Sequence, residues 1–179
     1  MTIRQAGVDD SAGIALVSVS AWRSNYAHIL PEEVLANLSV ASRAKKVRDR
    51  IQDGGSYWVA TDSDGVLGFV SVGPNRTTEI GADSEIYSIY VSPAKQHRGI
   101  GKRLLRTALP TLISTGSVSL CVFAFRDNVI ARRFYTGLGA IELDQSVFKV
   151  GDIEYPDQSY FWESIEDLIQ RLDSRLQSE

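Results

Sequence analysis

The order of apolar and polar positions along the chain predicts strands and helices in alternation. Strands are indicated where apolar residues alternate with polar ones, or form short runs rich in β-branched and aromatic residues. These stretches are residues 2–6, 56–62, 66–73, 85–91, 118–125, 140–150 and 157–165. Apolar residues spaced three or four apart predict helices. The helices cover residues 11–27, 28–52, 127–139 and 164–177, with one more from Gly99 onward. We therefore expect an α/β (α+β) fold with a mixed sheet.

Two prolines and one charged run indicate where two of the predicted helices begin or end and which part of one helix faces solvent. Pro31 is a favoured first-turn residue for the helix at 28–52. The second half of that helix, SRAKKVRDR, is strongly charged. Such a run is typical of a solvated face, and a binding patch is the alternative. Pro110 lies inside the helix that begins near Gly99, where a proline removes a backbone hydrogen bond and clashes with the preceding turn. We expect that helix to end or kink at Pro110.

Composition and charge exclude several classes of protein for this chain. The 179 residues are 44% hydrophobic and 23% charged, and no apolar run is long enough to span a membrane. A formal net charge of −3 without a long basic run argues against a general nucleic-acid binder. The single cysteine, Cys121, and two histidines far apart in the sequence predict neither a disulfide nor a metal site. The start, MTIRQAGVDD, has no apolar core of signal-peptide length, so we expect a cytoplasmic protein.

The stretch QHRGIGK, residues 96–102, has the composition of an anion site between a predicted strand and a predicted helix. A helix N-terminus carries unpaired amide N–H groups and about half a positive charge. Glycines at 99 and 101 remove side chains that would keep a ligand off that backbone, and Arg98 and Lys102 add positive charge. A phosphate or pyrophosphate suits this arrangement better than a carboxylate. A plain strand-to-helix turn is the alternative.

The glycine pattern excludes two common phosphate sites and matches a third. The P-loop pattern G-x-x-x-x-G-K-[ST] is absent, and Leu104 stands where G-x-G-x-x-G requires its third glycine. The remaining pattern, Q-x-x-G-x-G over residues 96–101, resembles the [QR]-x-x-G-x-[GA] signature of the GNAT superfamily of acetyl-CoA-dependent N-acetyltransferases.

Two flanking segments extend this resemblance. Upstream, EIYSIYVSPA is similar to the family's fourth strand, and downstream, NVIARRFYTGLGAIE is similar to its N-x-x-A-x-x-F-Y-x-x-x-G-[FA] segment. The resemblance covers residues 1–163, where we expect one GNAT-like domain. Residues 164–179 lie outside it and predict an amphipathic helix. Its apolar stripe covers either the core of its own chain or a second subunit, as in a homodimer.

The resemblance implies the architecture of the sheet, the identity of the cosubstrate and the residues that hold this cosubstrate. The sheet is expected to have about seven mostly antiparallel strands flanked by helices, and the cosubstrate is acetyl-CoA. The loop amides would hold the pyrophosphate, and the strand at 85–91 would bind the pantetheine arm through its backbone. The implied cofactor-binding residues are Ile89, Tyr90, Val91, Gln96, His97, Arg98, Gly99, Ile100, Gly101, Lys102 and Asn128.

The implied reaction needs a base and an acid. An alkylamine with a pKa near ~10.4 is mostly protonated at neutral pH, so a proton must be removed before the nitrogen can attack a thioester. Similar enzymes place a carboxylate base where Glu85 stands, and a tyrosine near the coenzyme sulfur where Tyr135 stands. We therefore expect Glu85 as general base and Tyr135 as general acid. A solvated edge residue and a core tyrosine are the respective alternatives. Cys121 is expected to be a buried, inert thiol, so transfer would be direct.

The acceptor is the least determined part of the implied reaction. In similar proteins the first two helices and their connecting loop form the wall of the acceptor site. That segment places Trp22, Tyr26 and His28 as candidate substrate-binding residues. A small-molecule amine such as a polyamine, a protein N-terminus and a lysine all remain open. Acidic side chains such as Glu32 and Asp83 either favour a cationic amine or are ordinary surface charges.

Two further functional classes use the same residues. A non-catalytic acyl-CoA sensor on the same fold would bind the cofactor without turnover. A phosphate-binding interaction module would use the glycine loop alone, and it would need neither the strand at 85–91 nor Tyr135.

Overall fold

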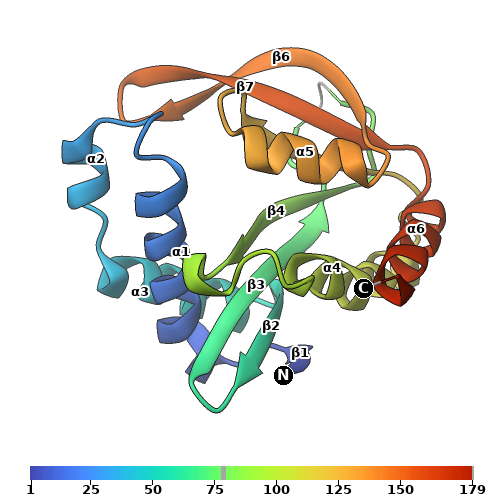
Figure 1. Cartoon of the computed structure of the whole chain (residues 1–179), viewed down its shortest axis with the longest axis horizontal. Helices are drawn as coiled ribbons and strands as arrows, with labels where there is room; N and C mark the ends of the chain where they lie inside the picture. Colours follow the sequence, from blue (N-terminus) through green and yellow to red (C-terminus); the bar gives the residue numbers. More distant parts are fainter. Residues whose placement is uncertain (78–79, 179) are drawn as a thin grey trace.

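A mixed sheet organises the computed structural model, which describes residues 1–77 and 80–178, with only the main chain at 144 and 145. Its strands are β1 (Thr2–Gln5), β2 (Ser56–Asp62), β3 (Gly65–Pro74), β4 (Ser84–Val91), β5 (Leu120–Phe125), β6 (Ile141–Val150) and β7 (Ile153–Trp162). Over the described residues the seven strands lie in the order β1-β2-β3-β4-β5-β7-β6 (Figure 1). Every neighbouring pair is antiparallel except β4 and β5, which are parallel. The predicted fold class is confirmed.

Helices cover both faces of this sheet. They are α1 (Ser11–Asn25), α2 (Glu32–Ala36), α3 (Val40–Gln52), α4 (Ile100–Ser114), α5 (Val129–Gly137) and α6 (Ile165–Gln177). Successive strand side chains point to opposite faces. Accordingly Val70 of β3 packs in one buried cluster with α4, α5 and α6, while its neighbour Phe69 packs in a second cluster with α1 and α3. None of the helices in the described ranges is long and apolar enough to cross a membrane.

The single helix predicted at 28–52 is wrong, because the chain forms two helices there. A short helix, α2, ends at Ala36, and α3 begins at Val40. Between them Ser39 adopts an extended conformation, and its hydroxyl accepts a hydrogen bond from the main-chain N–H of Ser42 at 3.2 Å. This serine cap satisfies one of the free amides at the start of α3, so it favours a new helix at this point.

The helix that begins after Gly99, α4, does not end at Pro110, which was one of the two outcomes expected there. α4 continues to Ser114, with Pro110 exposed on its outer side. Leu109 and Leu112, on either side of the proline, are buried against the sheet. Packing of this apolar face therefore offsets the hydrogen bond that proline removes from the helix.

The C-terminal helix α6 packs on its own chain. Ile165, Leu168 and Leu172 are buried in the same cluster as Leu105 and Leu109 of α4. An ion pair between Arg106 of α4 and Asp173 of α6 lies beside this contact.

The separation of β4 from β5 creates the space for a site. The two strands pair only from Ser84 to Ile86 on β4 and from Leu120 to Val122 on β5. Beyond Ile86 the strand β4 pairs only with β3, while β5 continues along β7 as far as Asp157. Figure 1 shows β4 diverging from β7 beneath α5. Because the β4 edge that faces the opening has lost its partner strand, it offers backbone groups to a ligand, although the Val91 carbonyl already accepts a hydrogen bond from Gln96 Nε2 at 3.3 Å.

Candidate active site

Two cavities meet where β4 and β5 separate. The first, of about 410 Å³, surrounds the loop before α4, and we call it the glycine-loop cavity. The second, of about 810 Å³, lies between α1, α3, β4 and β7, and we call it the aromatic cavity. Both volumes are typical of small-molecule sites. The residues that line both cavities are Tyr26, Ile86, Tyr87, Ser88, Tyr90, Phe123 and Ala124.

The glycine loop presents free main-chain amides to its cavity. Gly99 is the N-cap of α4 and has a left-handed conformation (φ 71°), which glycine adopts without strain. The first helical hydrogen bond runs from the amide of Arg103 to the carbonyl of Gly99, at 3.1 Å. The amides of Ile100 and Gly101 precede this bond, so they have no acceptor within the helix. These N–H groups and the positive end of the helix dipole suit an anion.

The second glycine leaves room for a ligand rather than for the protein's own packing. A Cβ atom added at Gly101 would meet Phe134 Cζ at 3.5 Å and Ile89 Cδ1 at 3.9 Å, both ordinary contacts. The fold therefore tolerates a small side chain at this position. The residues present thus fit a coenzyme A molecule, with the pyrophosphate at these amides and the pantetheine arm along the free edge of β4.

The helix α5 forms the opposite wall of the glycine-loop cavity. Asn128 caps it, because its side-chain oxygen accepts a hydrogen bond from the amide of Ala131 at 3.1 Å. Tyr135 lines the cavity, and its ring packs edge-on against Trp162 with the centroids 6.0 Å apart. In the described part of the chain the Tyr135 hydroxyl has no hydrogen-bond partner. Burial raises the pKa of Tyr135, so this phenol stays protonated at neutral pH and can act as a proton donor.

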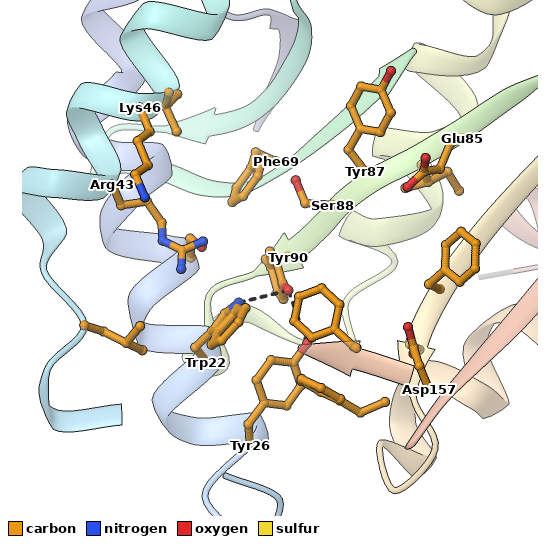
Figure 2. A pocket seen from close by; sticks show the side chains of 18 of the residues that line it. Trp22, Tyr26, Arg43, Lys46, Phe69, Glu85, Tyr87, Ser88, Tyr90 and Asp157 are labelled. Carbon is orange, nitrogen blue, oxygen red and sulfur yellow. Dashed lines mark hydrogen bonds between the residues drawn. The ribbon is translucent and has the colours of Figure 1, made fainter. Parts of the chain in front are cut away.

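Hydrogen-bonded aromatic residues form the floor of the aromatic cavity (Figure 2). Trp22 Nε1 donates a hydrogen bond to the hydroxyl of Tyr90 at 3.0 Å, and the hydroxyls of Tyr26 and Tyr90 lie 3.2 Å apart. Tyr26 packs edge-on against Phe125 at 5.0 Å. Burial raises the pKa of both tyrosines, so both stay neutral. Trp22 and Tyr26, predicted to bind substrate, therefore lie together at one site.

Glu85 lines the aromatic cavity, but its carboxylate is fully engaged. Arg76 Nε donates to Glu85 Oε2 at 3.0 Å, and the Arg76 main-chain N–H donates to the same oxygen at 3.2 Å. Arg76 Nη2 donates to the other oxygen, Oε1. The Arg76 guanidinium also lies 4.2 Å from the centroid of the Tyr87 ring. Glu85 would have to break this paired geometry before it accepted a proton.

Asp157 is the second carboxylate of the aromatic cavity, and the sequence analysis missed it. It lies in the middle of β7, opposite Phe125 of β5. The residue is 4% exposed. The only hydrogen bond that its carboxylate accepts from a described residue comes from the main-chain amide of Gln158, at 3.0 Å. No described cation pairs with it. Burial raises the pKa of Asp157 to about 6, which suits a group that accepts and releases protons near neutral pH.

Three cations of α3 also line the aromatic cavity. Arg43, Lys46 and Arg50 are spaced by three and four residues, so they share one face of the helix. Figure 2 shows Arg43 and Lys46 reaching toward the cavity on the side opposite Asp157. Lys46 and Arg50 are exposed, as expected for a solvated face, and the same face also lines a cavity, so the alternative of a binding patch stays open. The spacing of the three cations was a signal that could have identified them.

The structure keeps other predicted residues away from the two cavities. His28 is exposed, with Nε2 3.4 Å from the carbonyl oxygen of Asp127, and it lines neither cavity. Arg98 lines neither cavity, although its neighbours do. Asp83 accepts hydrogen bonds from the amides of Val118 and Ser119, which lower its pKa, so it joins two loops rather than facing a ligand. Glu32 and Glu33 lie exposed at the start of α2.

Among the described residues, neither Cys121 nor the residue types that commonly bind metal ions form a further site. Cys121 is buried, and burial raises the pKa of its thiol to about 12, so it is not a nucleophile at neutral pH. Among the residues whose side chains the structure describes, no group of His, Cys, Asp and Glu is arranged to hold a metal ion.

Comparison with known proteins identifies the family. The model of the acetyltransferase (GNAT) family matches residues 20–140. The chain is 30% identical over 163 residues to the uncharacterized N-acetyltransferase YuaI of Bacillus subtilis (strain 168), covering 90% of this chain and 92% of that protein. The chain therefore belongs to the acetyltransferase (GNAT) family, as the sequence motifs indicated.

Solved structures share the same fold. A GCN5-related N-acetyltransferase from Rhodopseudomonas palustris superposes with a TM-score of 0.72 at 20% identity, over 90% of this chain and 94% of that one. The protein yncA of Salmonella typhimurium, solved with its cofactor acetyl-CoA, superposes with a TM-score of 0.68 at 21% identity, over 91% of this chain and 93% of that one.

Proposed function

We propose that the protein is an acetyl-CoA-dependent N-acetyltransferase that transfers the acetyl group directly to a primary amine. The observation that carries this proposal is that the two cavities meet, with Asp157 on one side and Tyr135 on the other. A transferase that binds both substrates at once needs two adjoining sites. It also needs a base near the acceptor and an acid near the leaving group.

The glycine-loop cavity is the proposed cofactor site. The amides of Ile100 and Gly101 and the side chain of Lys102 would hold the pyrophosphate, and the unpaired edge of β4 from Ile89 to Val91 would hold the pantetheine arm. When bound, acetyl-CoA supplies an acetyl group activated as a thioester. A main-chain N–H near Tyr90 or Val91 would polarise the carbonyl of that group. The TM-score of 0.68 to a protein solved with acetyl-CoA supports this use of the fold.

Of the two described carboxylates that line the aromatic cavity, the geometry favours Asp157 as the general base. Glu85 was expected in this role, but both of its oxygens accept hydrogen bonds from Arg76. Asp157 has no cation beside it among the described residues, and burial places its pKa at about 6. It can therefore take a proton from the acceptor ammonium, directly or through water, without breaking an ion pair.

Tyr135 is the proposed general acid. It lines the glycine-loop cavity, and its free hydroxyl can donate a proton to the departing thiolate. Burial raises its pKa, so the phenol carries its proton at neutral pH. The buried thiol of Cys121, with a pKa of about 12, supports direct transfer rather than an acyl-enzyme.

Titration calorimetry with acetyl-CoA, with ATP and pyrophosphate as controls, tests the cofactor assignment. We expect micromolar binding that is selective for acetyl-CoA, followed by thiol release when an amine is added. Equal binding of all three ligands would contradict the assignment and favour a phosphate-binding module. Selective binding with no turnover on any amine would favour a non-catalytic sensor.

A further inference from the structure

We propose that the acceptor is an amine that also carries an oxyanion, as amino acids and aminoalkylphosphonates do, and that Arg43, Lys46 and Arg50 bind this oxyanion. The inference rests on the proposed function, because it assigns the acceptor of the same reaction. The oxyanion would lie against α3 and the amine against Asp157, across the aromatic cavity.

Among the residues whose side chains the structure describes, the charges that line the aromatic cavity do not balance. Four described cationic side chains line it, and the described carboxylates beside them are those of Glu85 and Asp157. Arg76 and Glu85 neutralise each other in an ion pair. Of the described carboxylates that line the cavity, only Asp157 is therefore left to balance the three α3 cations, in a chain whose formal net charge is −3. A local excess of positive charge in an acidic protein favours an anionic ligand group.

Among the described side chains, the α3 cations have no internal counter-ion. Within the part of the chain that the structure describes, no carboxylate oxygen lies within 4.0 Å of the charged groups of Arg43, Lys46 or Arg50. Asp49, on the same helix, pairs instead with Lys45 at 2.8 Å. The cations that line the cavity are thus left available to a ligand.

Arg43 is also held in place on the cavity wall. Its guanidinium carbon lies 5.1 Å from the centroid of the Trp22 ring, in a cation–π contact. Trp22 is in turn fixed by its hydrogen bond to Tyr90. A guanidinium fixed on an aromatic face keeps its N–H groups free, and its planar fork matches the two oxygens of a carboxylate or a phosphonate.

The two ends of the cavity therefore select a ligand with two charges of opposite sign. The amine nitrogen must approach Asp157, because it loses its proton there. The opposite wall is cationic, as Figure 2 shows for Arg43 and Lys46. A diamine or polyamine would place its second positive charge against this wall and would be repelled. An amino acid would place its carboxylate there.

Matched acceptors test this directly. At saturating acetyl-CoA, thiol release is measured with the common α-amino acids, with 2-aminoethylphosphonate, and with the amine that remains when each carboxylate is removed, such as tyramine for tyrosine and cadaverine for lysine. We expect kcat/KM to favour the oxyanion-bearing member of the best pair by at least about tenfold. Comparing carboxylates with the phosphonate separates the two sources of the oxyanion.

Variants of α3 assign the preference to residues. Lys46→Glu and Arg43→Gln are each expected to reduce the preference about tenfold or more. Arg48→Glu is the matched control, because it makes the same change of charge as Lys46→Glu. Arg48 is exposed on the same helix but lines neither cavity. It should leave the preference unchanged. Thermal melting and acetyl-CoA titration verify that each variant is folded and binds the cofactor.

The outcomes separate this inference from the proposed function. If acetyl-CoA does not bind, the proposed function fails. If acetyl-CoA binds but no acceptor of the panel is acetylated, or the matched amines react as well as the acids, the acceptor class is wrong while the cofactor assignment stands. The inference is also overturned if the preference survives in both Lys46→Glu and Arg43→Gln.

Discussion

The two cavities are built from different parts of the chain. The glycine-loop cavity takes its anion site from consecutive main-chain groups at the start of α4, next to the end of β4. The aromatic cavity takes its chemistry from side chains of α1, α3, β4 and β7, which lie far apart in the sequence. The first arrangement requires only glycines and a helix end. The second requires the whole sheet to be assembled before Asp157 faces the cations of α3.

This difference separates the two tasks of a transferase. In the proposed reaction, main-chain amides would bind a group that is the same in every turnover, and few side chains would be needed for it. Side chains from several elements can change independently, so they determine which acceptor enters. The following variants test this division, beginning with the largest expected effect.

Asp157→Asn is expected to lower kcat/KM about 10³-fold, because an amide cannot accept the proton of the acceptor ammonium. In the wild type kcat/KM should rise with pH through an inflection near 6, the pKa of this buried carboxyl. Steady-state rates between pH 5 and 8 measure both effects. The matched control is Glu85→Gln, which should retain the acidic inflection. If Glu85→Gln removes the inflection and Asp157→Asn keeps it, the base is Glu85.

Gly101→Asp is expected to weaken acetyl-CoA binding about 100-fold or more, because it places a side chain and a negative charge at the pyrophosphate site. The fold should be retained, since a Cβ at Gly101 makes only ordinary contacts and an acidic residue suits the first turn of a helix. Calorimetric titration measures the change in Kd. Thr107→Asp is the control, because this substitution adds the same negative charge to α4 at a residue that lines neither cavity. Unchanged binding in Gly101→Asp would exclude the loop as the anion site.

Tyr135→Phe is expected to lower kcat about 10- to 100-fold while the Kd for acetyl-CoA changes little, because only the proton donor is lost. The ring contacts with Tyr160 and Trp162 remain, so the melting temperature should be preserved. Tyr160→Phe provides the control, because Tyr160 belongs to the same aromatic cluster but lines neither cavity. Equal losses of kcat in the two variants would indicate packing rather than proton donation.

The smallest expected effect is on stability. The pKa of Asp157 is raised from 3.8 to about 6 in the folded state, so the folded protein binds this proton more tightly than the unfolded chain does. The free energy of unfolding therefore falls as pH rises from about 4 to 6. At pH 7 Asp157→Asn should be more stable than the wild type by about 1–2 kcal/mol, and the difference should vanish below about pH 4. Urea unfolding at both pH values measures it, and a loss of stability at pH 7 would contradict a desolvated, unpaired carboxylate.

The same contrast explains what could be predicted from the sequence. The order of the strands, most of the helices, the family and the glycine loop are local patterns, so they could be read from adjacent residues, although the break between α2 and α3 was not. Asp157 could not, because it is the first of three consecutive polar residues, Asp157 to Ser159, that are all buried in β7. Neither periodicity nor composition marks such a residue. The cations of α3 were visible as a helical spacing, but only the fold shows that this face of the helix lines a cavity.

A crystal structure of the protein with acetyl-CoA would show whether the two cavities hold the two substrates as proposed. We expect the pyrophosphate within hydrogen-bond distance of the amides of Ile100 and Gly101, the pantetheine arm along the free edge of β4, and the thioester between Tyr135 and Asp157. A complex in which the pyrophosphate lies away from the glycine loop, or in which the thioester points out of the aromatic cavity, would contradict this proposal.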